Sequence, residues 1–198
     1  MPGEPVADAW RARYQPQLET VRRGEREWVV LDVLHREALD DVLAELGLDL
    51  GEAERDALTL AWHRLDPWPD TVAGLTRLKV RSTIAPCSNG HIAQSVNLAR
   101  HAGLPWDAIL GAEIARAYKP DPIVYRASVA ALGIEPGEAM MVAAHNADLA
   151  AAAECGLRTA FIARPREYGP GQRTDLRADA DVDVEAADLE ALAEALGA

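Results

Sequence analysis

The stretch MMVAAHNADLAAAAECGLRTAFIA, residues 140–163, predicts the fold of this chain. Its two apolar runs, Met140–Ala144 and Thr159–Ala163, have the length of buried strands. Between them an alanine-rich segment from Ala147 has the length of a helix, and Gly156 is suited to end it. Strands that alternate with helices pair in parallel, because the helix carries the chain back across one face of the sheet. The stretch therefore predicts a β–α–β unit.

The same alternation extends toward the N-terminus. The sequence has a β-like run at Thr83–Cys87, a helical pattern from about Ile92 to His101, a short apolar run at Ala108–Leu110 and a further helix after KPDP at residues 119–122. We therefore expect an α/β chain with a doubly wound, Rossmann-like parallel sheet. In such sheets the chemistry collects at the carboxyl ends of the strands.

The first third of the chain has helical periodicity instead. Apolar residues recur at helical spacing over Val6–Val21, from Asp32 to Gly47 and over Glu52–Leu65. The two prolines of DPWPDT, residues 66–71, then interrupt the chain. We expect a helical unit over residues 1–66 and an α/β unit over residues 67–198.

Composition narrows the classes of function. The 198 residues carry a formal net charge of −12, which repels nucleic-acid phosphates and anionic lipid. Two cysteines are too few for a disulfide framework, and the first residues lack the basic and apolar regions of a signal peptide. No apolar run reaches membrane-spanning length. We expect a cytoplasmic protein that binds neither nucleic acid nor membranes.

Three polar clusters stand where strands should end: CSNGH at 87–91, YKPDP at 118–122 and HNAD at 145–148. In this order they resemble the haloacid dehalogenase (HAD) superfamily, whose α/β core carries a cap. AWRARYQPQLE at 9–19, SNG, YKPDPIVY and MMVAAHNADLAAA are more closely similar to the type II, or L-2-haloacid, dehalogenases. The resemblance implies a helical cap over the core, hydrolysis of short 2-haloacids without a cofactor or metal, and a homodimer.

The resemblance also implies roles for individual residues. Arg11 would hold the departing halide, while Ser88 and Asn89 would bind the substrate carboxylate. Lys119 would pair with the nucleophile, and Tyr125 would support that site. Asp148 would orient Lys119 or the hydrolytic water, for which His145 is a second candidate. Each role is chemically sound, because an ammonium keeps a nucleophilic carboxylate ionised and a guanidinium stabilises a leaving anion.

The nucleophile itself is the main departure. In this family it ends the first strand, in a pattern of apolar residues, Asp, two residues, Gly and Thr. Asp32 follows the apolar run Trp28–Leu31 but precedes VLHR, and a helix-capping role is the favoured interpretation. We therefore expect the nucleophile and the first strand to lie upstream of residue 1, and the chain as given to be inactive.

Two other functions remain open. A magnesium-dependent phosphatase of the same superfamily would need a metal ligand near Ala144, and an alanine side chain cannot bind a hard cation. A non-catalytic anion-binding protein would keep the pocket without the nucleophile. Plainer interpretations exist for single residues as well: a helix cap for Ser88, a surface ion pair for Arg11 and a loop position for Lys119. His91 has no partner at metal-ligand spacing.

Overall fold

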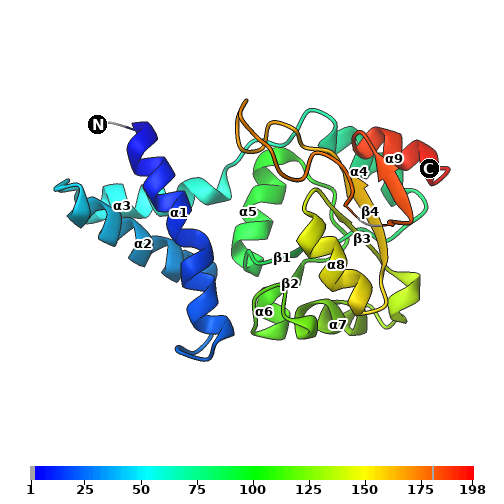
Figure 1. The fold of residues 1–198 in the computed structure, drawn as a ribbon, viewed down its shortest axis with the longest axis horizontal. Coiled ribbons are helices and arrows are strands. Elements are labelled where there is room, and N and C mark those ends of the chain that lie inside the picture. Colours follow the sequence, from blue (N-terminus) through cyan, green and yellow to red (C-terminus); the bar gives the residue numbers. More distant parts are fainter. Residues whose placement is uncertain (1–2, 180) are drawn as a thin grey trace.

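The computed structural model describes residues 3–179 and 181–198. Its elements form two groups that lie side by side (Figure 1). The first, called here the N-terminal helical group, consists of α1 (Gly3–Arg22), α2 (Leu31–Glu45), α3 (Glu52–Thr59) and the 3-10 helix η1 (Leu60–His63). The expectation of a helical first third is confirmed, with the third helix ending as a 3-10 turn rather than running to Leu65.

Asp32 does not have the helix-capping role that its sequence context suggested. Helix α2 already begins at Leu31, its N-cap is Val30, and no side chain caps it. Asp32 stands in the first turn, where a negative charge is favourable to the helix dipole. The capping prediction is therefore wrong. Residues 27–30 form no strand, so Asp32 does not end one either.

The second group alternates short strands with helices. Its elements are α4 (Thr71–Lys79), β1 (Cys87–Ser88), α5 (Ile92–Ala102), β2 (Leu110–Gly111), α6 (Ala112–Ala115), α7 (Pro122–Ala131), η2 (Pro136–Glu138), β3 (Met140–Ala143), α8 (Asn146–Glu154), β4 (Arg158–Ile162), β5 (Val184–Ala186) and α9 (Leu189–Ala195). The predicted β–α–β unit of β3, α8 and β4 is confirmed, and Gly156 follows its helix with a φ of +86°. The sequence did not predict α4, β5 or α9.

Every strand pair in the described chain is parallel, as expected, but the strands form two sheets. In one, β1 pairs with β2, with Ser88 opposite Gly111. In the other, β4 lies between β3 and β5. The run predicted from Thr83 pairs only at Cys87 and Ser88, because Pro86 has no N–H to donate to a ladder. A single doubly wound sheet is therefore too simple a description.

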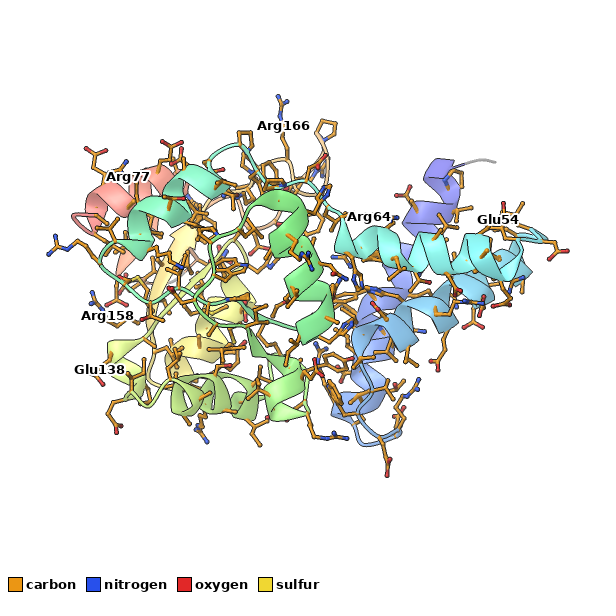
Figure 2. All side chains as sticks on the ribbon, turned by 180° about the vertical axis from the view of Figure 1, so that it is seen from behind. Glu54, Arg64, Arg77, Glu138, Arg158 and Arg166 are labelled. Carbon is orange, nitrogen blue, oxygen red and sulfur yellow. The ribbon has the colours of Figure 1, made fainter. Side chains whose placement is uncertain are left out.

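The core of the α/β group lies between its sheet of three strands and two helices. Buried side chains of α4 and α9 pack with Ala160, Ile162 and Ala186 from β4 and β5. The two helices cross closely at Gly74, where an added Cβ would lie 2.4 Å from that of Leu189. Charged side chains point outward at the periphery, among them Glu54 on the helical group and Arg158 on the far side (Figure 2).

The helical group is attached to the α/β group just before Lys119. The buried Tyr118 packs with Leu18 and Leu31, and its hydroxyl donates a hydrogen bond to the carbonyl of Val29 at 2.7 Å. Burial raises the pKa of Tyr118, so this hydroxyl keeps its proton. The segment that carries the predicted catalytic lysine is thereby fixed against the helices. None of the described helices is both long and apolar enough to cross a membrane.

Candidate active site

The side chains of Lys119 and Tyr125 both contact the carboxylate of Asp148. The Lys119 Nζ lies 2.6 Å from Asp148 Oδ2, and the Tyr125 hydroxyl donates to Asp148 Oδ1 at 2.5 Å. The side chains of Lys119 and Asp148 are only 15% and 14% exposed, so this ion pair is poorly screened by water. Burial, and then the bond to Asp148, raises the pKa of Tyr125, which therefore remains a donor. The two carboxylate oxygens of Asp148 thus each have a donor.

The loop after β1 joins this group through Asn89. Its Oδ1 accepts the backbone N–H of Lys119 at 2.7 Å, and its Nδ2 donates to the Tyr14 hydroxyl at 3.3 Å. Ser88 Oγ accepts the N–H of Gly90 at 3.0 Å, which leaves the hydroxyl proton of Ser88 available to a ligand. The capping interpretation of Ser88 is not supported, because the N-cap of α5 is His91.

Gly111 sets the position of the Ser88 loop from the neighbouring strand. Its φ is +115°, a backbone conformation that side chains disfavour. A Cβ at this position would lie 2.2 Å from the carbonyl oxygen of Ser88 and 2.5 Å from its nitrogen. Only glycine lets the two strands approach this closely, so residue 111 determines where the Ser88 loop lies.

Helix α1 contributes Arg11, Tyr14 and Arg22 to this region. The Arg11 guanidinium lies over the Tyr14 ring, 5.0 Å from its centroid, and forms no salt bridge within the part of the chain that the structure describes. The surface ion pair considered for Arg11 is therefore not seen. Arg22 donates to the backbone carbonyl of Lys119. Neither Tyr14 nor Arg22 was predicted from the sequence as part of the site.

His145 contacts residues of the loop after β4 rather than Lys119 or Asp148. Its Nε2 lies 2.9 Å from Glu167 and 3.2 Å from the Tyr168 hydroxyl, both in the loop after β4. The hydrogen bond to Glu167 raises the pKa of His145, so its protonated form is favoured. Tyr168 also shares a surface hollow with Arg11. Through these contacts the loop reaches the same side of the molecule as α1.

The comparisons with known proteins agree on one family. A haloacid dehalogenase-like hydrolase model matches residues 2–156. The crystal structure of the L-2-haloacid dehalogenase PA0810 superposes with a TM-score of 0.97 at 49% identity, covering 100% of this chain and 84% of that one. That of the defluorinating L-2-haloacid dehalogenase Rha0230 gives 0.95 at 50% identity, covering 98% and 80%. The chain belongs to the L-2-haloacid dehalogenase family.

A further relative is less similar to this chain. The (S)-2-haloacid dehalogenase of Xanthobacter autotrophicus is 30% identical over 82% of this chain, and the chain spans 64% of that enzyme's length. A structure from the same organism, with chloropropionic acid covalently bound, superposes at a TM-score of 0.82 with 25% identity, covering 99% of this chain and 88% of that one. The family consists of hydrolases that act on carbon–halide bonds.

One cluster of side chains was not predicted from the sequence. Asp32, His63 and His91 bring a carboxylate and two imidazoles together, although they are far apart in the sequence. His35 lies near them, stacked on Trp62 with ring centroids 4.5 Å apart, and burial lowers its pKa to about 4. No local sequence rule signals these contacts, because the partners come from α2, η1 and the loop after β1.

Proposed function

We propose that this chain carries the substrate-binding and charge-balancing part of a hydrolytic (S)-2-haloacid dehalogenase. The substrate would be a short 2-haloacid, and the reaction would pass through an aspartyl ester. The observation that carries the proposal is that Lys119 and Tyr125 both contact Asp148, while the loop of Asn89 is bonded to the backbone of Lys119. The division into a cap over residues 1–66 and a core over residues 67–198, and a homodimer, remain predictions.

Lys119 provides the positive charge that the reaction needs. A carboxylate attacks carbon only while it is ionised, and a nearby ammonium lowers the pKa of such a nucleophile. Because Lys119 is mostly buried, water screens its field only weakly, and its Nζ lies beside the Asp148 carboxylate. Asp148 is therefore a positioning residue for Lys119. It is also the better candidate to orient the hydrolytic water, since His145 is tied to Glu167.

The Ser88 loop and Arg11 would bind the two ends of the substrate. The Ser88 hydroxyl proton is available for a carboxylate, whereas both ends of the Asn89 amide are already engaged. Asn89 would therefore position the Ser88 loop and Lys119 rather than bind substrate directly. Arg11 would stabilise the leaving halide, because its weakly hydrated guanidinium is permanently charged. Tyr14 would position both Arg11 and Asn89, because its side chain contacts each of them.

The nucleophilic aspartate would come from a further parallel strand between β1 and β3. These strands belong to different sheets, and the residues of β3 are only half-buried, whereas four of the five in β4 are buried. Such a strand would complete one sheet and carry its carboxyl end toward Ser88 and Lys119. The only carboxylate bonded to Lys119 Nζ in the described residues is Asp148, so this chain alone would not release halide.

Complementation with a peptide tests this proposal. The peptide would carry an apolar strand followed by Asp, two residues, Gly and Thr; its control would have Asn in place of that Asp. We expect halide release from (S)-2-chloropropionate only with the Asp peptide, and none from the (R) enantiomer. Lys119→Met should abolish the release.

Other results of these assays would contradict part of the proposal or favour a different function. Halide release by the chain alone would contradict the added strand but not the dehalogenase activity. Binding of 2-chloropropionate without release, even in a longer chain with the Asp pattern, would favour an anion-binding protein. Magnesium-dependent turnover of a phosphate ester would favour a phosphatase, against the argument from Ala144.

A further inference from the structure

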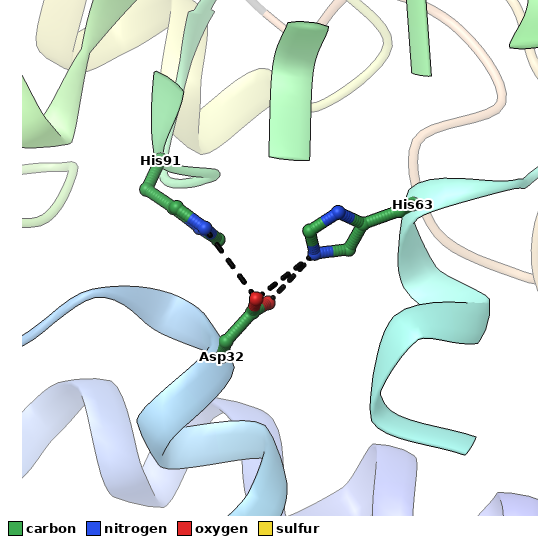
Figure 3. Close-up of side chains that lie close together, drawn as sticks. All are labelled: Asp32, His63 and His91. Carbon is green, nitrogen blue, oxygen red and sulfur yellow. Dashed lines mark hydrogen bonds and ion pairs between the residues drawn. The ribbon is translucent and has the colours of Figure 1, made fainter. Parts of the chain in front are cut away.

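Asp32, His63 and His91 converge from three separate segments. Asp32 stands in the first turn of α2, His63 ends η1, and His91 precedes α5 (Figure 3). The Nε2 of His63 lies 2.9 Å and 3.0 Å from the two oxygens of Asp32, and the Nε2 of His91 lies 3.4 Å from Oδ2. Figure 3 shows both rings pointing at the carboxylate. One ligand atom from each residue lies within 4.8 Å of the others.

Hydrogen bonds alone leave this cluster incompletely satisfied. The His63 and His91 side chains are 5% and 8% exposed, so water reaches neither ring freely. The 3.4 Å separation of His91 from Asp32 is long for an N–H to oxygen hydrogen bond. The other ring nitrogen of His91, Nδ1, has no partner in the described residues and lies outside the proposed site. The Nε2 of His91 is therefore not engaged in a short hydrogen bond with Asp32 and can instead face a cation held between the three side chains.

We propose that Asp32, His63 and His91 bind a divalent transition-metal ion, with Zn²⁺ as the best fit. Two imidazole nitrogens and one carboxylate oxygen are the ligands of a borderline cation, whereas Mg²⁺ and Ca²⁺ prefer oxygen alone. Zn²⁺ bonds of about 2.0–2.1 Å in a tetrahedron place neighbouring ligand atoms about 3.3 Å apart. The Oδ2 of Asp32 lies 3.0 Å from the Nε2 of His63 and 3.4 Å from the Nε2 of His91, on either side of this value.

An outer contact supports the same assignment. The Nδ1 of His63 lies 2.9 Å from the Asn97 side chain, the kind of outer contact that orients a metal-binding histidine. Binding through Nε2 moves the His63 proton to Nδ1, where the Asn97 carbonyl oxygen can accept it after the amide turns.

The ion would connect the two groups of elements beside the candidate active site. Asp32 and His63 belong to the N-terminal helical group, while His91 follows Ser88, Asn89 and Gly90 directly in the sequence. Binding would therefore fix the Ser88 loop against the helices without using any residue assigned to the reaction. The site does not depend on the proposed dehalogenase activity and can be tested in the chain alone.

Binding of Zn²⁺ and Co²⁺ to chelator-treated protein tests the inference. We expect one Zn²⁺ per chain by calorimetry, and a melting temperature that rises with Zn²⁺ but not with Mg²⁺. Co²⁺ should produce the visible absorption of a four-coordinate ion with nitrogen and oxygen ligands. Wild-type protein with neither stabilisation by Zn²⁺ nor this absorption would overturn the proposal, whatever the behaviour of variants.

Substitutions then locate the site. Asp32→Asn and His91→Gln should each weaken Zn²⁺ binding by at least tenfold. The matched control is His101→Gln, because His101 also faces an aspartate, Asp66, at 3.0 Å, but at the surface. This control should bind Zn²⁺ like the wild type. Unchanged affinity in folded Asp32→Asn and His91→Gln proteins, checked by circular dichroism, would place the ion elsewhere and refute the assignment.

Discussion

The side-chain oxygen of Asn89 accepts the backbone N–H of Lys119 at 2.7 Å, so the loop after β1 and the lysine segment are joined directly. The two residues are 30 positions apart in the sequence. The Asn89 side chain therefore helps to fix how the lysine backbone meets the Ser88 loop, together with the bond from Arg22 to the Lys119 carbonyl. This contact gives the first prediction.

Asn89→Ala should lower the free energy of unfolding by about 1–3 kcal/mol, because it leaves a part-buried N–H without an acceptor. Urea unfolding of the 198-residue chain measures the change. His101→Gln, which breaks an exposed pair, is the control and should cost about 0–1 kcal/mol. Equal effects of the two substitutions would show that the Asn89 contact does not contribute to stability.

Lys119 and Asp148 should be strongly coupled. Asp148→Ala leaves a mostly buried ammonium unpaired and should cost about 3–5 kcal/mol, as should Lys119→Met for the opposite charge. The double variant should lose about 2 kcal/mol less than the sum of the two single losses. A double-mutant cycle by urea unfolding measures this coupling. Simple additivity would mean that water, rather than the partner, stabilises each charge.

Gly111→Ala should be among the most damaging small substitutions. The new methyl group would collide with the Ser88 backbone at a φ of +115°, with an expected loss of about 3 kcal/mol or more. Gly133→Ala is the matched control, since its φ is also positive at +68° but no atom lies within 4 Å of the added Cβ. We expect about 1 kcal/mol there. Thermal unfolding of both variants separates collision from backbone strain.

His35 should make stability depend on pH. Burial lowers its pKa from 6.5 to about 4, so the unfolded chain binds a proton that the folded chain rejects. The stability that the neutral His35 side chain contributes is fully present above pH 6.5 and is lost as the pH falls toward 4. Through this one group the free energy of unfolding should fall by about 2 kcal/mol between neutral pH and pH 5. His35→Leu should unfold with a shallower pH dependence over this range, and parallel curves for the two proteins would contradict the assignment.

The sequence predicted most of the helices, because their apolar residues repeat at helical spacing, and the strand–helix–strand unit at residues 140–163. Strand β5 was not predicted because Val184–Ala186 is short and stands among acidic residues. Helix α4 was not predicted because the prolines before Thr71 were interpreted only as an interruption of the chain. The lysine, tyrosine and aspartate of the site were predicted from a family resemblance. Asp32 was assigned wrongly because its partners His63 and His91 lie 31 and 59 positions away, beyond the reach of any local rule.

The hydrogen bond from Arg22 to the carbonyl of Lys119 links helix α1 to the residue that carries the key positive charge. A displacement of α1 would therefore break this bond or carry the Lys119 backbone with it. The place of the lysine in the fold is thus set in part by a helix residue 97 positions away in the sequence.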